Sequence, residues 1–505
     1  MIKNICLDDY DISPLLGLLS PEPPCTRLSA QCYGLWEALV CEVTALLLHK
    51  TFRSRVHQLP VLSSSALATR REYQRAFHIL ALLAHAYVWG LEGEKVMQVL
   101  PKALSLPWLE ISAYLGMRPV STHAAMALWN WRKVKPSLSV SRNSITTLEL
   151  TRGGVDESWF FLVAVGVEAA GGPALAALVS AIECTARRDS SSLATHLTQI
   201  AVHVRQMSAV LDRMREHCDP YVFYKYIRRH LSGWNDRKVF PRGLIYEGDD
   251  GRIRQAEKDE IRWVKLTFGE DDQRDYTSSN AALPSSETSA SAEDLVEGAR
   301  YGGASAAQSS LLSALDIGLG VRHYQHAQNP DLPRRPSIFL REMQWHMPKL
   351  HRQLLYDLER GPAVHAFVDE LPRDASPDRA ADGVHPCVRA YNAALHCIED
   401  FRSRHLQIVE TYIIEPARAA AAAEAAAVEK RSKGEAEQDM HAYGTGGAGH
   451  LISFLQDYHL CDVWKRMYTR LCASNTVRFQ HTQLISKDQV CQLAICSNII
   501  AVRQF

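Results

Sequence analysis

The chain has 505 residues, of which 47% are apolar and 22% are charged, which indicates an ordinary globular protein with a large core. Lys plus Arg equals Asp plus Glu at 56 each, so no overall field favours nucleic acid or an anionic membrane as a partner. Acidic residues at positions 8 and 9 interrupt any export signal, and the twelve cysteines include no C-x-x-C pair, so we expect a cytoplasmic chain with reduced thiols.

Apolar residues recur at helical spacing along most of the chain, and alternating strand patterns are scarce, so the pattern predicts an all-α fold. The most apolar stretch, residues 160–182, contains Glu168 and the run Gly171, Gly172 and Pro173. These interruptions favour two buried helices over one membrane span. The predicted helices cover residues 35–49, 70–91, 158–169, 174–186, 193–215, 308–319 and 388–414.

Composition divides the chain into parts. A Pro- and Ser-rich joint at residues 134–144 separates a small N-terminal helical domain, residues 1–143, from a large helical-bundle domain, residues 144–455. Residues 249–299 are rich in Asp, Glu, Ser and Arg, which predicts a disordered insertion. The Ala-rich segment 419–443 has no apolar stripe to bury, so we expect an exposed, mobile helix there. The tail, residues 456–505, is unlike the rest.

The last predicted helix carries a histidine within its apolar stripe. In HCIEDFRSRHLQIVETYIIEP, residues 396–416, His405 shares a helix face with Ile398, Phe401, Ile408, Val409 and Tyr412. We expect Pro416 to end this helix. A buried neutral imidazole must find a hydrogen-bond partner or a metal, because an unsatisfied polar group costs about 1 to 3 kcal/mol. The pattern alone leaves two interpretations, a satisfied core histidine or a ligand.

Three other motifs also have two interpretations each. GTGGAGH, residues 444–450, fits G-x-G-x-x-G but follows no hydrophobic strand, so a loop that closes over a ligand is favoured over a dinucleotide site. GGASAAQSS, residues 302–310, would let a planar ligand or another helix approach the backbone. Arg228, between Phe223 and Trp234, suits either a carboxylate among stacked rings or an interhelical salt bridge. The sequence contains neither G-x-S-x-G nor H-E-x-x-H, so hydrolase and zinc-protease chemistry are not supported.

Eight short motifs, here called sequence words, occur along the chain in this order: AYVWG, WFFLV, LSGW, GLIYEG, GGASAAQSS, FLREMQWHMPKLHRQLL, RSRHLQIV and GTGGAGHLISFL. As a set, from about residue 59 to residue 455, they make the chain similar to the indoleamine 2,3-dioxygenase family. The resemblance implies a small N-terminal domain packed on a large helical domain that holds haem b through one proximal histidine. His405 stands at that histidine's place in RSRHLQIV, and Asp316 and Arg402 match a polar pair that supports the ligand.

The resemblance also implies how a substrate would bind. Phe160 and Phe223 match residues that pack around an indole, and Arg228 matches the residue that pairs with the substrate carboxylate. The implied reaction needs the indole held against the haem and water excluded, and it needs no acid or base from the protein.

Five further residues complete the implied substrate site. Ser305 and Ala306 match small residues close to haem and substrate, and Thr445 matches a loop threonine that closes on the amino acid. Ala164 stands where mammalian members carry a serine. His123 falls where they carry a pocket tyrosine, which leaves the preference for substituted indoles open.

The resemblance implies a dioxygenase that cleaves the indole C2–C3 bond of L-tryptophan with O2 to give N-formylkynurenine, the first step of the kynurenine pathway to NAD. We expect it to act as a monomer and to need an electron donor that reduces the haem. One alternative is a haem protein of the same fold that binds dioxygen or an indole without turnover. Another is a helical interaction scaffold. The trio Phe160, Phe223 and Arg228 favours the dioxygenase, because gas storage does not require it.

Overall fold

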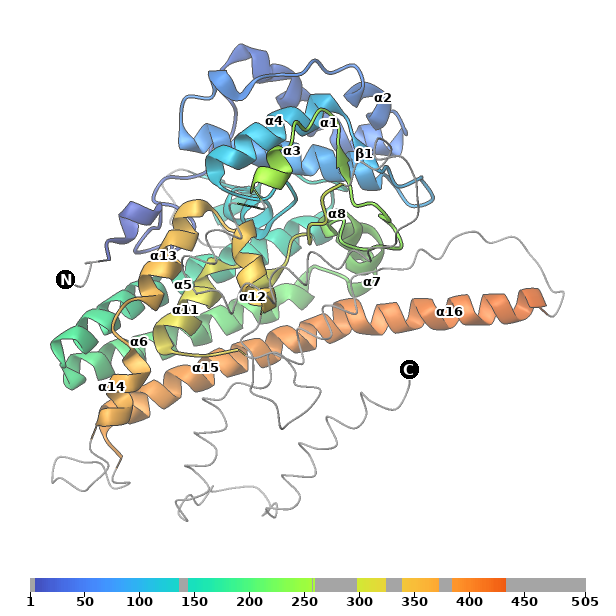
Figure 1. The fold of residues 1–505 in the computed structure, drawn as a ribbon. Coiled ribbons are helices and arrows are strands. Elements are labelled where there is room, and N and C mark those ends of the chain that lie inside the picture. Colours follow the sequence, from blue (N-terminus) through green and yellow to red (C-terminus); the bar gives the residue numbers. More distant parts are fainter. Residues whose placement is uncertain are drawn as a thin grey trace, which may run out of the picture. The chain divides into compact units, whose positions relative to one another are not determined.

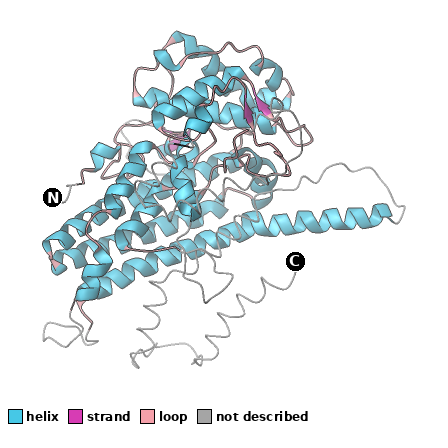
Figure 2. Ribbon diagram, in the orientation of Figure 1, coloured by secondary structure: helices cyan, strands magenta, loops and turns pink. Residues whose placement is uncertain are grey.

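The computed structural model describes residues 5–135, 144–256, 258, 298–323, 338–371 and 384–432. All of them belong to one compact unit, Met1–Cys461. Helices dominate these residues (Figure 2), which confirms the all-α prediction. Strands among the described residues form two short pairs, β1 (Val99–Leu100) parallel to β4 (Ile245–Tyr246) and β2 (Trp131–Lys133) antiparallel to β3 (Ile145–Thr147).

The helices follow the predicted order along the chain. The N-terminal group consists of α1 (Gly34–Leu48), α2 (Phe52–Val56), α3 (Arg70–Trp89) and α4 (Lys102–Leu115). The later helices are α5 (Val155–Arg187), α6 (Ser190–Asp212), α7 (Pro220–Val222), α8 (Arg228–Leu231), α11 (Ser310–Leu319), α12 (Ile338–Met343), α13 (Lys349–Glu359), α14 (Val364–Glu370), α15 (Pro386–Val409) and α16 (Glu415–Ser432). The division into domains at residue 143 stays a prediction.

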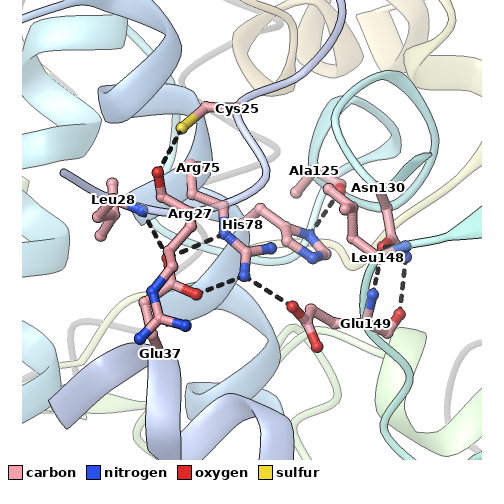
Figure 3. Close-up of polar contacts among 10 residues, drawn as sticks. All are labelled: Cys25, Arg27, Leu28, Glu37, Arg75, His78, Ala125, Asn130, Leu148 and Glu149. Carbon is pink, nitrogen blue, oxygen red and sulfur yellow. Dashed lines mark hydrogen bonds and ion pairs between the residues drawn. The ribbon is translucent and has the colours of Figure 1, made fainter. Parts of the chain in front are cut away.

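Helix α3 organises the N-terminal group. A capping box between Thr69 and Glu72 starts the helix, and the residues that follow are buried almost continuously as α3 packs against α1 and α4. Arg75 on α3 donates to Glu37 of α1 and to Glu149, which precedes α5, each through Nη2 at 2.6 Å (Figure 3). Because one guanidinium joins two carboxylates, it ties the N-terminal helices to the start of the α5 region.

Helix α5 is continuous from Val155 to Arg187, so the prediction of two helices over residues 158–186 is wrong. Its glycines serve close packing: a Cβ on Gly171 would lie 2.2 Å from Leu311 of α11, and one on Gly172 would lie 2.4 Å from the backbone of Gly17. Pro173 lies inside the helix at a cost of about 3 kcal/mol. Apolar burial on both sides of Pro173 offsets that cost.

Helices α5, α6 and α15 run side by side (Figure 1), with α6 packed against both of the others. Two apolar stretches among the described residues, α5 and Gln31–Leu48, are long enough to cross a membrane, and 61% of the α5 window is buried inside the protein. Such burial is typical of a core helix.

The helix that carries His405 does not end at Pro416, so that prediction is wrong. Helix α15 passes through a π-helical turn, Glu410–Ile414, into α16, and Pro416 is the second residue of α16. A proline is tolerated there because the π turn has already interrupted the regular hydrogen-bond ladder in front of it. Helix α16 confirms a helix over the Ala-rich segment as far as Ser432, and residues 419–423 are exposed.

Several predictions concern residues outside the described ones. These are Thr445, the glycine-rich segment 444–450, the tail 456–505 and most of the predicted insertion 249–299. The two ends of that insertion are described. Ala299 is buried and forms a β-bridge with Leu244, so the end of the insertion belongs to the fold.

Candidate active site

His405 lies on α15, next to the buried residues Phe401, Ile408 and Val409. Burial lowers the pKa of its imidazole to about 4, so the ring is neutral near pH 7. The side chain is partly exposed, and no described residue forms a hydrogen bond with it. Because no described residue occupies its ring nitrogens, the lone pair of the neutral imidazole is available to a ligand.

One helical turn before His405, Arg402 donates to Oδ1 of Asp316 on α11. His323 Nε2 lies 2.9 Å from the other carboxylate oxygen, Oδ2. Burial alone would raise the pKa of Asp316, but the charges of Arg402 and His323 and their hydrogen bonds hold it below its usual value. The pair Asp316 and Arg402 is thus in contact, as expected, and His323 is a third member that the sequence did not indicate.

A row of aromatic rings crosses the region. The Phe160 ring on α5 lies 4.7 Å from the Phe223 ring, and Phe223 in turn lies 5.8 Å from Tyr412, centroid to centroid. Tyr412 follows His405 on the same continuous helix and donates to the carbonyl of Cys218 at 2.6 Å. The row therefore connects the two predicted indole-packing residues with the helix of His405.

Arg228 begins α8, next to this row. Burial lowers the pKa of its guanidinium, and the ring of Tyr224, 5.5 Å away, is the partner that the structure shows. No acidic side chain pairs with Arg228 among the described residues. The alternative of an interhelical salt bridge is therefore not supported there, and a desolvated cation without a carboxylate suits an anionic ligand.

Glycines bring the segment of Arg228 against the segment of Ser305. A Cβ on Gly303 would lie 1.9 Å from the carbonyl oxygen of Leu231, so the two backbones touch. Two backbone hydrogen bonds join them, from Trp234 N to Tyr301 O and from Ala304 N to Leu231 O, both 2.9 Å. The small-residue segment therefore approaches another chain segment closely, and the same contact brings it near α8.

Gln308 links two predicted site residues and was missed from the sequence. Its Oε1 accepts from the backbone N–H of His123 at 2.9 Å and from that of Ser305 at 3.4 Å, while its Nε2 donates to Gly303 O at 2.8 Å. Ser305 caps the short helix that contains Ala306. The next residue, Ala307, packs in an apolar cluster with Val409 of the His405 helix.

Glu168 was also missed as a site residue. Its Oε1 lies 2.7 Å from Nε2 of His123 and accepts from Ser309 Oγ at 2.7 Å, while no partner reaches Oε2 among the described residues. Ala164 precedes Glu168 by one helical turn. A single acid inside the apolar run FFLVAVGVEAAGG was the available signal, because a buried carboxylate needs a partner.

Three π-helical turns occur in the part of the chain that the structure describes. They are Ala124–Leu128 directly after His123, Phe223–Ile227 directly before Arg228, and Glu410–Ile414 after His405. Such turns are rare and are frequent at functional sites. Two of them adjoin a predicted site residue and the third begins five residues after His405, which supports the grouping independently of side-chain contacts.

The described residues contain no group of three or more His, Cys, Asp or Glu side chains that could hold a metal ion. No such cluster among the described residues therefore includes His405. Among the residues that the structure describes, no hydrogen bond or ion pair joins His123 or Arg228 directly to His405, and the aromatic row and the Ala307 cluster connect their elements.

Comparison with known proteins assigns most of the chain, independently of this geometry, to one group of proteins. A family model described as Indoleamine 2,3-dioxygenase matches residues 6–266 and 272–460. The match includes the N-terminal residues before position 59, which the eight sequence words did not reach.

Similar proteins come from both animals and fungi. Indoleamine 2,3-dioxygenase 2 of Mus musculus is 29% identical over 456 residues, which are 90% of this chain and 93% of the relative. Indoleamine 2,3-dioxygenase of Saccharomyces cerevisiae is 31% identical over 423 residues, 81% of this chain and 80% of the relative. Indoleamine 2,3-dioxygenase nanC of Aspergillus nanangensis is 29% identical over 469 residues, 90% of this chain and 95% of the relative.

Proposed function

Because this chain belongs to the indoleamine 2,3-dioxygenase family, a family of oxidoreductases, we propose that it cleaves the C2–C3 bond of L-tryptophan with O2 to give N-formylkynurenine. The product would enter the kynurenine pathway to NAD. We also propose a cytoplasmic, monomeric enzyme that depends on an electron donor for its reduced state.

One observation carries the proposal. Two desolvated polar groups lack a polar partner among the described residues, the imidazole of His405 on α15 and the guanidinium of Arg228 on α8. The contact between Phe223 and Tyr412 in the aromatic row joins the segment that leads into α8 to the continuation of α15. An iron ligand, flat aromatic surfaces and a carboxylate receptor are the three features that an aromatic amino acid and a haem require.

The residues present fit haem b. His405 would hold the iron as the single protein ligand, and the pair Asp316 and Arg402 would support it from the next turn of α15 and from α11. Bound haem would supply the site at which dioxygen is activated. Ala164, Ser305 and Ala306 are small enough to let a flat ring approach.

The chain's own contribution to the reaction is placement of the substrate. Arg228 would pair with the carboxylate of tryptophan, and Phe160 and Phe223 would hold the indole by stacking and exclude water. Gln308 and Glu168 would fix the orientation of His123 at the wall of the same site. Thr445 would close over the amino acid.

The deciding test is an assay of the full chain, loaded with haem, with tryptophan, a reductant and air. We expect absorbance from N-formylkynurenine, and we expect His405→Ala to lose the Soret band together with turnover. Bound haem without product would favour the alternative of a haem protein that binds without turnover. Retained haem in His405→Ala would contradict the ligand assignment.

A further inference from the structure

His323 is placed against Asp316 by the turn that ends α11. Gly320, with φ of +76°, caps the helix in a left-handed conformation, and Val321 N donates to Asp316 O at 2.8 Å. The chain reverses at this point. The imidazole of His323 therefore returns to the last turn of the helix and meets the Asp316 side chain.

The carboxylate of Asp316 is held from both sides. Oδ1 accepts from Arg402 and Oδ2 lies 2.9 Å from His323 Nε2, with side-chain exposures of 7% for Asp316, 7% for His323 and 11% for Arg402. A carboxylate with both oxygens engaged at buried sites cannot rotate without breaking a strong hydrogen bond. His323 therefore determines how Asp316 is presented to Arg402.

Arg402 is the link to the candidate iron ligand. It precedes His405 by three residues on α15, so both side chains lie on the same side of the helix. A displacement of Asp316 would release Arg402 next to His405. The hydrogen bond from His323 also withdraws negative charge from the Asp316 carboxylate, which makes the electrostatic potential around Asp316 less negative.

We propose that His323 is a positioning residue for haem binding, which fixes the Asp316 carboxylate and through it the Arg402 guanidinium beside His405. The inference rests on the proposed function, because it requires haem iron on His405. It adds a third residue to the predicted pair of Asp316 and Arg402.

The test uses the full-length, haem-loaded His323→Leu variant, in which Asp316 loses one donor. The uncompensated carboxylate favours ferric over ferrous iron, so we expect the midpoint potential to fall. We also expect a shifted iron–imidazole stretching band and roughly tenfold faster loss of haem to excess apomyoglobin, the lower range for removal of an outer ligand partner. An unchanged potential and an unchanged band would overturn the proposal.

Two controls separate positioning from stability. His323→Gln keeps a donor and should restore the potential, and its failure to do so would contradict the hydrogen-bond explanation. His78→Leu removes another buried histidine. His78 lies on α3, and its Nδ1 is 2.8 Å from the carbonyl oxygen of Ala125. That variant should lose stability while its haem potential stays unchanged, and an equal shift there would overturn the proposal.

If His323→Leu does not fold, His323→Asn gives the same comparison with His323→Gln, because its shorter amide falls short of Asp316. The proposed function and the role of His323 are contradicted by different results. Haem retained by His405→Ala sinks the proposed function. Haem lost by His405→Ala but an unmoved potential in the His323 variants sinks only the role of His323.

Discussion

Two arginines that are desolvated by the surrounding protein have opposite surroundings. Arg75 has two carboxylates, Glu37 and Glu149, whereas Arg228 has an aromatic ring and no acid among the residues that the structure describes. Burying an unpaired charge costs several kcal/mol, so such a group persists only if something compensates for it. Arg75 is accordingly structural, and Arg228 is expected to be compensated by the carboxylate of a ligand.

Replacing Arg228 by alanine should weaken use of tryptophan. A charge-assisted hydrogen bond contributes about 1.5 to 3 kcal/mol, so we expect kcat/KM to fall roughly 10- to 150-fold, mostly through KM. Steady-state kinetics with tryptophan measures this. Arg229→Ala is the matched control, because Arg229 lies over the Trp89 ring at 5.8 Å instead. Equal kinetics for the Arg228→Ala variant and the unmodified chain would refute the carboxylate role.

At the scale of elements, the site depends on one backbone contact. The segment that follows α8 and the segment that precedes α11 touch at Gly233 and Gly303, where a Cβ on either residue would lie 2.2 Å or less from a backbone oxygen. Backbone atoms cannot move aside as the end of a flexible side chain can. The contact therefore fixes the spacing between α8, which begins with Arg228, and Ser305.

The variant Gly303→Ala should separate these two segments. We expect a loss of about 1 to 3 kcal/mol in the free energy of unfolding, as for an overpacked core, together with a raised KM for tryptophan. Urea denaturation and kinetics measure the two effects. Gly34→Ala is the control, because open space surrounds Gly34 at the start of α1 and its φ is −54°. The free energy of unfolding of this variant should rise by up to about 1 kcal/mol. Unchanged stability in Gly303→Ala would contradict this prediction, because it would mean that the two backbone segments can move apart at little cost.

At the scale of the whole molecule, buried histidines tie stability to pH. Burial lowers the pKa of His78, His85 and His230 to about 3, and these residues lie on α3 and α8. In the unfolded chain each histidine titrates near 6.5. Between these values the unfolded state binds more protons than the folded state, so stability is lost as the pH falls.

The free energy of unfolding should therefore decrease steadily from pH 6.5 to about pH 5. In this window unfolded carboxyl groups are still largely ionised, so the histidines dominate. Burial raises the pKa of Glu157, which acts in the opposite direction, but it is one group against three. Urea titrations of the haem-free protein at several pH values measure the slope, and His85→Gln should flatten it. A slope of zero would contradict the assignment of these histidines as neutral.

The sequence by itself determined the features of the fold and of the family that depend on local sequence pattern. Helical periodicity over α1, α3, α6, α11 and α15 predicted their existence, and the apolar stripe of α15 placed His405 among buried neighbours. The eight ordered words indicated the family, which the family model then matched across most of the chain. Such features are readable because neighbours three or four residues apart on a helix share one face.

Only the tertiary structure decided which distant residues meet. Glu168 contacts His123 across 45 positions, Gln308 contacts His123 across 185, and Asp316 contacts Arg402 across 86. The continuation of α5 through Pro173 and of the His405 helix into α16 was decided the same way. Local propensity disfavoured both, and packing against other helices outweighed it, because burial energy depends on partners that no local window of sequence contains.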